Sequence, residues 1–430
     1  MNHSSSQNVI KFILLMTCLA IVTIAEDHFF CIINLSASSV TRIQIFFSLL
    51  AFCLTITKTK INANNIGYLF KYFVIIVLFL LSQFLYTMIK YPAGSIRDFI
   101  QAARSYFWII LTFPIYYIIT KKRDGFRRLC DMLSIIVVIS LGILLLIALF
   151  YNNSNGFLFN IEEFYTLQRR NNRLRLWDLS SLEGFIALWL FYKFLYAHKK
   201  RILYIIGLLI IIGALIYVEQ TRVMLISIFL CIFIMFISKQ SKKWHELFYK
   251  ILLIIVVIAG IVYIGLISDL FNSFSVTGHR PVSTINRIDE ILYSFELIKQ
   301  NPIMGTGLVS YTVNNLNDNY HGYDYFEITD IGVIGLITQI GIGAFFVYIF
   351  PMIRFGYILM KTRAYHNKEP YPYLFSVFIF LIFTSGTLVV MNPQRIFAWP
   401  FCLAFFEYWN SKCKSITIKL NRYDELNQSS

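Results

Sequence analysis

The sequence has few charged residues, no visible internal repeat and no ordered cysteine pattern. Charged residues make up 14% of the chain, whereas soluble domains carry about 25%. The seven cysteines are scattered without metal-ligand spacing, so they indicate neither a disulfide framework nor a zinc site. The missing repeat removes one argument for a transporter built from inverted halves.

What the chain has instead is a series of continuous apolar runs of roughly 18 or more residues, each long enough to cross about 30 Å of hydrocarbon. Because these runs do not alternate with polar residues, they predict helices and not a barrel. We expect an all-α polytopic membrane protein in which residues 1–430 form one transmembrane domain of about twelve helices. The expected spans are 9–25, 40–57, 66–89, 98–119, 131–151, 179–197, 202–218, 222–238, 248–268, 328–352, 371–390 and 396–410.

Basic residues predict the orientation of these spans. Clusters at 121–123, 199–201 and 242–243, together with the C-terminal tail, fall on alternate loops. They predict that this face and both termini are cytoplasmic. On the opposite face 10 of the 12 expected basic residues are arginines, the residue type suited to bidentate binding of carboxylate and phosphate. The net charge of +15 therefore indicates topology and an outer anion site, and we expect no nucleic-acid partner.

Two outer loops are expected to be long, at 152–178 and 269–327, and loops of that length are usually functional or disordered. The first holds a cluster of arginines that is either a solvated basic loop or an attractor for anionic sugars and lipid headgroups: Arg169, Arg170, Arg173 and Arg175. In the second, residues 288–298 carry apolar side chains at helical spacing and end at Asn301-Pro302. This pattern predicts a short amphipathic helix outside or along the membrane surface.

Three segments carry candidate chemistry. The first is Glu219-Gln220-Thr221-Arg222, at the mouth of a span. In the second, Arg287 precedes Pro302 by fifteen residues and Gly305-Thr306-Gly307 follows. In the third, His321 is followed by Asp330 nine residues later and Gly332 eleven residues later. In order and spacing, these segments resemble the family of O-antigen polymerases and O-antigen ligases. The sequence departs from that family in having Asp330 where Glu is commoner and in lacking an aromatic residue often found in the loop helix.

The resemblance implies a bacterial inner-membrane enzyme with a periplasmic active site. It implies a glycan polymerase that transfers a growing polysaccharide from undecaprenyl pyrophosphate to a new lipid-linked repeat unit. A ligase that transfers finished polymer to a lipid A core uses the same donor chemistry and stays open, as does a lipid-linked oligosaccharide flippase. The expected partners are the lipid-linked oligosaccharide, the bilayer and a chain-length regulator protein. No metal or other cofactor is expected.

The predicted roles follow from the charge that develops on the departing pyrophosphate. Arg222 and Arg287 would neutralise it through charge-assisted bonds, and His321 would activate the acceptor hydroxyl as a general base. Asp330 would orient the histidine or cap the following helix, and the two glycines would let the backbone approach the donor. The residues expected to bind substrate are Asp330, Gly305, Gly307, Arg104 and Arg395.

Simpler explanations exist for each of these residues. His321 could be a solvated loop residue, Arg222 could snorkel at the end of a span, and Arg287 could solvate an exposed helix face. Asp330 could be only an N-cap. Arg104, inside an expected span, could bind lipid pyrophosphate or snorkel. The residues Asp318, His321, Asp324 and Glu327 could instead hold Mg²⁺ or Mn²⁺.

Overall fold

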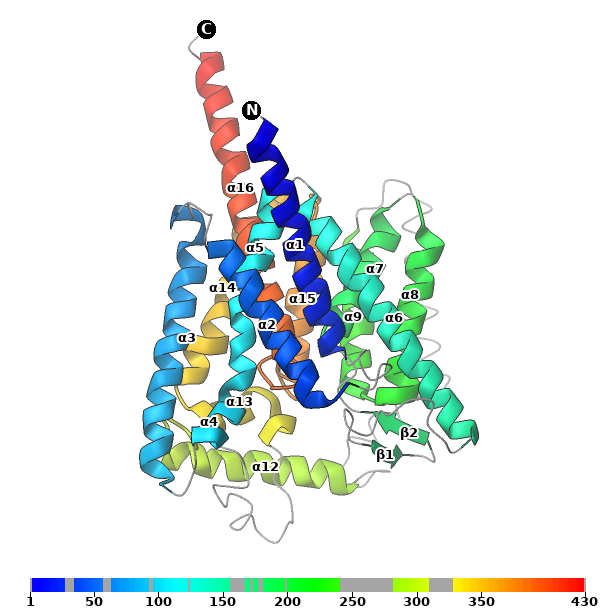
Figure 1. The fold of residues 1–430 in the computed structure, drawn as a ribbon, viewed down its shortest axis with the longest axis vertical. Helices are drawn as coiled ribbons and strands as arrows, with labels where there is room; N and C mark the ends of the chain where they lie inside the picture. The colour runs from blue at the N-terminus through cyan, green and yellow to red at the C-terminus, as the bar shows by residue number, and fades with distance from the viewer. Residues whose placement is uncertain are drawn as a thin grey trace.

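The computed structural model describes residues 2–27, 35–56, 63–92, 96–122, 124–154, 167–170, 173–176, 181–197, 199–239, 281–308 and 328–428. These residues form a bundle of helices (Figure 1). Both chain termini lie at one end of the bundle, called the terminal end below. The helix α12 (Pro281–Gln300) lies across the opposite end, called the α12 end.

The N-terminal half is built from long apolar helices and one small hairpin. Its elements are α1 (Asn2–Glu26), α2 (Ala37–Ile56), α3 (Ala63–Lys90), α4 (Ile96–Ala103), the 3₁₀ segment η2 (Arg104–Leu111), α5 (Thr112–Lys121), α6 (Gly125–Ser154), β1 (Leu167–Arg170), β2 (Arg173–Leu176) and α7 (Glu183–Tyr196). The strands β1 and β2 pair antiparallel, with Leu167 opposite Leu176. This hairpin lies within the predicted loop 152–178.

The C-terminal half contains shorter and more interrupted helices. Its elements are α8 (Arg201–Ala214), the π-helical turn η3 (Leu215–Glu219), α9 (Arg222–Ser238), α12, η4 (Ile328–Ile331), α13 (Gly332–Ile340), η5 (Phe345–Ile349), α14 (Phe350–Lys361), η6 (Arg363–Tyr365), α15 (Tyr371–Thr384), η7 (Ile396–Ala398) and α16 (Trp399–Gln428). The interruptions fall mainly between residues 328 and 345, beside α12.

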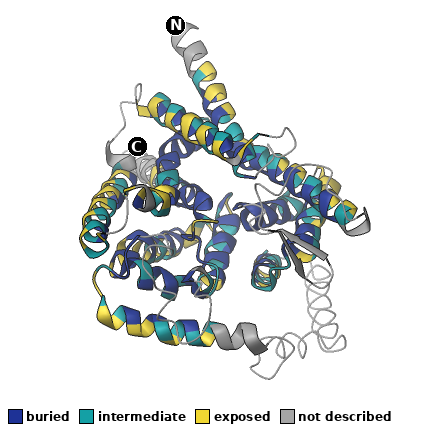
Figure 2. Cartoon of the chain, turned by 60° about the horizontal axis from the view of Figure 1, so that its bottom comes forward, coloured by how far each residue is buried: buried dark blue, intermediate teal, exposed yellow. Residues whose placement is uncertain are grey.

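The helix α12 confirms the amphipathic helix predicted for residues 288–298. It runs along one edge of the bundle and crosses the direction of the other helices (Figure 2). One face carries exposed apolar side chains, and the other is buried against the protein. The exposed residues are Ile288, Leu292 and Phe295, and the buried residues are Glu290, Ser294 and Leu297. Such a helix is shaped to lie at an interface between the protein and lipid.

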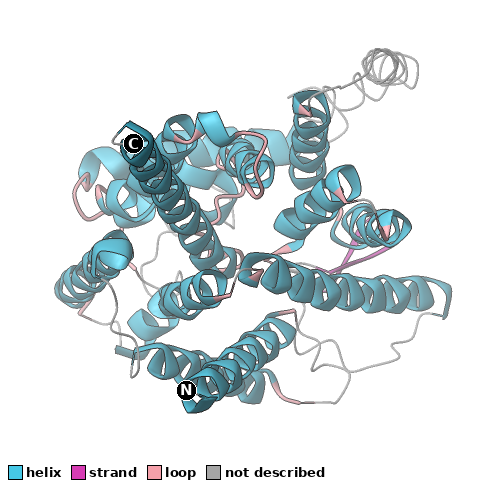
Figure 3. Cartoon of the chain, turned by 90° about the horizontal axis from the view of Figure 1, so that it is seen from above, coloured by secondary structure: helices cyan, strands magenta, loops and turns pink. Residues whose placement is uncertain are grey.

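The predicted helical fold is confirmed, with the β1–β2 hairpin as an addition among the described residues (Figure 3). Six helices are long and apolar enough to cross a membrane, and α9 and α15 are shorter apolar helices. The chain is therefore a multi-pass membrane protein. The expected span 248–268 lies outside the described residues, so the total of twelve stays a prediction.

The expected span 328–352 is wrong as one continuous helix. The helix α13 ends at Ile340, and Gly341 adopts φ 58° and ψ −138°, a conformation that favours glycine. A second helical segment follows and runs through η5 and α14 to Lys361. Gly341 therefore breaks the helix between α13 and η5.

Two other expected spans differ in form. Residues 98–119 are not one α-helix, because the 3₁₀ segment η2 separates α4 from α5. The last expected span, 396–410, is the first part of a helix that continues to Gln428. The apolar residues determine which part of a helix lies in the membrane. The polar residues that follow also favour a helix, so this last helix extends beyond the apolar part.

Aromatic side chains fill much of the bundle core. Trp189, Trp399 and Trp409 are fully buried, and Phe355 stacks on Phe406 with ring centroids 4.2 Å apart. Buried indoles find polar partners, as the Trp399 Nε1 donates to the Tyr72 hydroxyl at 2.8 Å. The core is thus packed by large rings, and the Nε1 groups of the three buried tryptophans donate to partners inside the protein.

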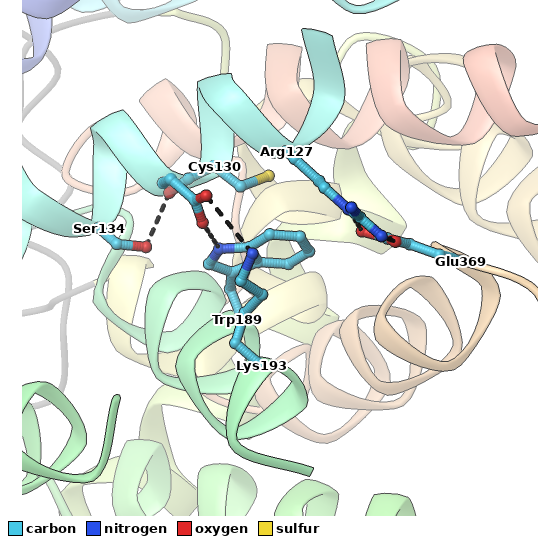
Figure 4. A network of polar contacts seen from close by, with 7 residues as sticks. Arg127, Cys130, Ser134, Trp189, Lys193 and Glu369 are labelled. Carbon is cyan, nitrogen blue, oxygen red and sulfur yellow. Dashed lines mark hydrogen bonds and ion pairs between the residues drawn. The ribbon is translucent and has the colours of Figure 1, made fainter. Parts of the chain in front are cut away.

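Two ion pairs hold the first turns of α6 against neighbouring segments (Figure 4). Arg127 donates through Nε to Glu369, which lies between α14 and α15, at 2.7 Å. Asp131 accepts from Trp189 Nε1 at 3.0 Å and from Lys193 Nζ at 3.4 Å, both on α7. These contacts fix α6, α7 and the start of α15 relative to one another.

Candidate functional site

The turn between α8 and α9 carries the first predicted motif. The α8 helix widens into η3 and stops at Glu219, after which Gln220 adopts a left-handed conformation with φ 58°. Thr221 is extended, and Arg222 is the first residue of α9. The strand β2 packs against η3. The motif therefore lies near the hairpin, at the α12 end of the bundle (Figure 1).

Arg222 is half-buried, and within the described part of the chain it makes no hydrogen bond or ion pair. Its place at the first position of α9 adds the positive end of the helix dipole to its own charge. A partly shielded guanidinium at such a position can bind an anion more strongly than one in bulk water.

Arg287 and Asp330 bring the second and third motifs together. The Nη2 of Arg287, on α12, lies 3.7 Å from the Oδ2 of Asp330, in η4. Both side chains are 35% exposed, so the pair is accessible from solution. A single contact at this distance leaves other guanidinium donors of Arg287 able to bind a second anion.

The glycines of the second motif contact the end of α13. Gly305 and Gly307 have φ values of 68° and 99°. The amide of Thr306 donates to the Thr338 carbonyl at 2.8 Å, and that of Gly307 donates to the Gln339 carbonyl at 2.9 Å. These bonds satisfy carbonyl groups that a helix C-terminus leaves without internal partners. The geometry thus gives both glycines a role in holding α13, while their predicted contact with the donor stays a prediction.

The C-terminal end of α3, with Tyr91 just after it, contacts the same 301–307 loop. The Tyr86 hydroxyl donates to the Gly305 carbonyl at 3.0 Å, and Lys90 Nζ donates to that hydroxyl at 2.8 Å. The Tyr91 hydroxyl donates to the Thr306 carbonyl at 2.9 Å, and burial raises the pKa of Tyr91. Sequence reasoning missed these residues, because Tyr and Lys at the end of a span usually indicate only an interfacial anchor.

Arg395 is mostly buried and pairs with the first motif. Its Nη2 lies 3.7 Å from Oε1 of Glu219, and the two side chains are 13% and 4% exposed. The buried carboxyl group of Glu183 interacts electrostatically with both Glu219 and Arg395. Arg395, predicted to bind substrate, is thus engaged by carboxylates inside the protein.

Further polar contacts extend this cluster toward α1 and α2. The Ser181 hydroxyl donates to the Gln394 carbonyl at 2.8 Å and to Glu26 Oε1 at 3.2 Å. Gln44 Nε2 donates to Glu26 Oε2 at 3.0 Å. The sequence analysis did not assign a role to Glu26 or Glu183. Each is an acidic residue at the edge of an apolar run, and that position could have marked it as a candidate.

Arg104 lies at the junction of α4 and η2, where it is exposed. It makes no hydrogen bond or ion pair with the described residues. The expected position inside a span agrees with the candidate membrane span Phe99–Lys121, in which the helix changes to the 3₁₀ form at this residue. Its role in binding lipid pyrophosphate stays a prediction.

Several predicted residues lie outside the described residues. These are His321 and the other members of the alternative metal site, Asp318, Asp324 and Glu327. The four arginines of the first outer loop lie in the strands β1 and β2.

Arg287 lies on α12, which packs against α13, and Arg222 begins α9 directly after η3, which packs against β2. The Gly305–Gly307 segment is held between α3 and α13. Binding of an anion by both arginines stays a prediction. Guanidinium groups held on helices can stabilise developing negative charge without reorganising at the moment of reaction. The buried ion pair between Arg395 and Glu219 holds the turn before Arg222 from inside the protein.

Comparison with known proteins tests the resemblance. A family model described as O-antigen ligase matches residues 206–349, the segment that contains all three motifs. No curated protein matches the chain. The match covers about a third of the chain and supports its resemblance to the O-antigen polymerase and ligase family.

Proposed function

We propose that this protein is a glycan polymerase. It transfers a growing polysaccharide chain from undecaprenyl pyrophosphate to a new lipid-linked repeat unit, in the synthesis of O-antigen or capsular polysaccharide. The family and the multi-pass membrane fold support a glycosyltransferase-like enzyme that acts on lipid-linked sugars. The reaction takes place on the periplasmic side of the bacterial inner membrane, the side that carries the predicted arginine-rich loops.

In the proposed reaction the acceptor hydroxyl attacks the sugar carbon bonded to pyrophosphate, and the carbon–oxygen bond to the carrier breaks. His321 accepts the hydroxyl proton, a step for which a positioned base contributes about 10²–10⁴-fold. Arg222 and Arg287 stabilise the departing pyrophosphate in place of a metal ion. Asp330 orients Arg287 through the ion pair between them.

The observation that carries the proposal is the ion pair between Arg287 and Asp330. It brings together the second and third motifs of the family, which the sequence separates by a long loop. Arg222, from the first motif, supplies a second cation at the start of α9, just after η3, which packs against the hairpin at the same end. Two arginines around a polar surface match the charge of a diphosphate.

Purified protein in liposomes, supplied with undecaprenyl pyrophosphate-linked repeat units, tests the proposal. We expect a ladder of longer lipid-linked chains, and no ladder from the Arg222→Ala/Arg287→Ala protein. A matched control is Lys299→Ala, which removes an exposed positive charge from the same helix as Arg287. Movement of the repeat unit across the bilayer without chain growth would instead indicate a flippase.

A ligase is the second candidate, because the matching family model is described as O-antigen ligase. Gene deletion separates the two enzymes. Loss of long chains with single repeats still attached to the lipid A core indicates the polymerase. Loss of all attached repeats indicates the ligase and contradicts the present proposal.

A further inference from the structure

The loop at 385–395 lies outside the segment matched by the family model, yet it contacts two of the three motifs. At one end, the amide of Val333, the residue that follows the Asp330–Gly332 segment, donates to the Ser385 carbonyl at 2.9 Å. At the other end, Arg395 pairs with Glu219. One short segment therefore contacts both the start of α13, which follows Asp330, and the end of η3, which precedes Arg222.

The contact at Gly332 is close. Gly332 has φ 58°, and a Cβ at this position would lie 2.2 Å from the Ser385 carbonyl oxygen. Only glycine permits this approach of two backbones. The start of α13, and Asp330 just before it, is thus set directly against the 385–395 loop.

The contact at Glu219 is buried. Arg395 and Glu219 are 13% and 4% exposed, and a charge at that depth must be compensated by its partner. Glu219 leads into the left-handed Gln220 and then into Arg222. The orientation of Arg222 at the start of α9 therefore depends on how Glu219 is held.

The loop itself is held in place. The Arg395 amide donates to the Asn392 carbonyl at 2.8 Å, and the Gln394 carbonyl accepts the hydroxyl of Ser181. Ser181 also donates to Glu26. Ser181 thus links the backbone next to Arg395 to α1 and to the turn before α7.

We propose that Arg395 is a positioning residue for Arg222. Its ion pair with Glu219 holds the turn that precedes Arg222. The 385–395 loop, which carries Arg395, thereby sets the distance between Arg222 and Asp330. Arg395 does not bind the pyrophosphate itself. The inference rests on the proposed function for the role of Arg222. Burial and engagement with Glu219 distinguish Arg395 from Arg222, which is half-buried and has no polar partner among the described residues.

Kinetics of chain elongation test the proposal. Arg395→Gln should lower kcat by about 10- to 100-fold, the loss that a misplaced catalytic group causes, and leave the KM for the lipid-linked donor within about twofold. Arg395→Lys should restore most of the rate because it keeps the charge opposite Glu219. The Arg222→Ala/Arg395→Gln protein should be no slower than Arg222→Ala alone, because both changes remove the same interaction. Multiplying effects, or a raised donor KM in Arg395→Gln, would overturn the proposal.

Amide hydrogen exchange tests the same contact without activity. Arg395→Gln and Glu219→Gln should each speed exchange at residues 220–225, and Arg395→Lys should not. The matched control is Arg127→Gln, which breaks the ion pair with Glu369 elsewhere in the bundle and should leave residues 220–225 unchanged. Faster exchange in protein that elongates nothing would support the positioning contact and contradict the proposed function. Unchanged exchange in both Gln variants would overturn the positioning contact, whatever the activity.

Discussion

Arg287 on α12 and Asp330 in η4 form an ion pair with 3.7 Å between Nη2 and Oδ2. Both side chains are accessible, and exposed pairs of this kind contribute only about 0.2–1 kcal/mol to stability. The pair therefore matters for the orientation of Arg287 more than for the stability of the fold. Its location beside α13 links the loop helix to the glycine-containing segment that follows Asp330.

The first prediction separates the two members of this pair. Arg287→Ala should slow chain elongation by about 10²–10³-fold, the usual loss when a group that stabilises developing charge is removed. Asp330→Asn should cost less than about tenfold, because the guanidinium remains. Elongation rates and thermal unfolding of both proteins provide the measurement. Wild-type elongation by Arg287→Ala would exclude Arg287 from the site.

The second prediction concerns the general base. His321→Ala should lower the elongation rate by about 10²–10⁴-fold. The rate of the unaltered protein should fall as the pH drops through about 6.5, where a histidine base becomes protonated. The control is His366→Ala, an exposed histidine beyond α14, which should leave both rate and pH profile unchanged. A pH profile that survives His321→Ala would assign the base elsewhere.

The third prediction concerns the backbone of the 301–307 loop. In Gly305→Ala the new Cβ would lie 2.6 Å from the backbone of Gln339 while φ stays near 68°. Left-handed strain alone costs about 1–3 kcal/mol, so the protein should unfold at a lower temperature in detergent. Gly386→Ala is the control, because a Cβ there meets nothing within 4 Å. Equal unfolding temperatures for the two variants would mean that the loop relaxes freely.

The fourth prediction concerns the stability of the core. Arg354 on α14 donates to Glu407 on α16 through two bonds, at 2.5 and 3.0 Å, and Glu407 is 4% exposed. Arg354→Ala should destabilise the protein by about 3–5 kcal/mol, because it leaves a buried carboxylate without its cation. Arg354→Leu/Glu407→Leu should recover much of this loss. Thermal or denaturant unfolding measures both, and equal loss in the double variant would contradict the electrostatic explanation.

The fifth prediction tests the sidedness of the bundle. In a protein whose native cysteines are replaced, Lys299→Cys on α12 should react with a membrane-impermeant maleimide in intact spheroplasts. Lys414→Cys on α16 should react only after the membrane is permeabilised. These residues lie on elements at opposite ends of the bundle (Figure 1). The reverse labelling pattern would invert the predicted topology.

Much of this protein could be predicted from local sequence. A run of apolar residues determines membrane insertion by itself, because each backbone group in lipid must be satisfied within its own helix. The membrane fold and the helix around residues 288–298 could therefore be predicted. The resemblance to the O-antigen ligase family could also be recognised, because its motifs depend on spacing along the chain. The arginines could also be identified as candidate anion-binding residues, because a guanidinium group binds anions whatever its position in the fold.

Only the tertiary structure decided which of these arginines is accessible and which is buried. No local pattern indicates that Arg395 meets Glu219, or that the Gly305–Gly307 segment closes the end of α13. Such contacts join segments far apart in the chain, and they depend on how whole helices pack. Hydrophobicity acts on each segment alone, whereas the position of a side chain at the α12 end is the result of all the segments together.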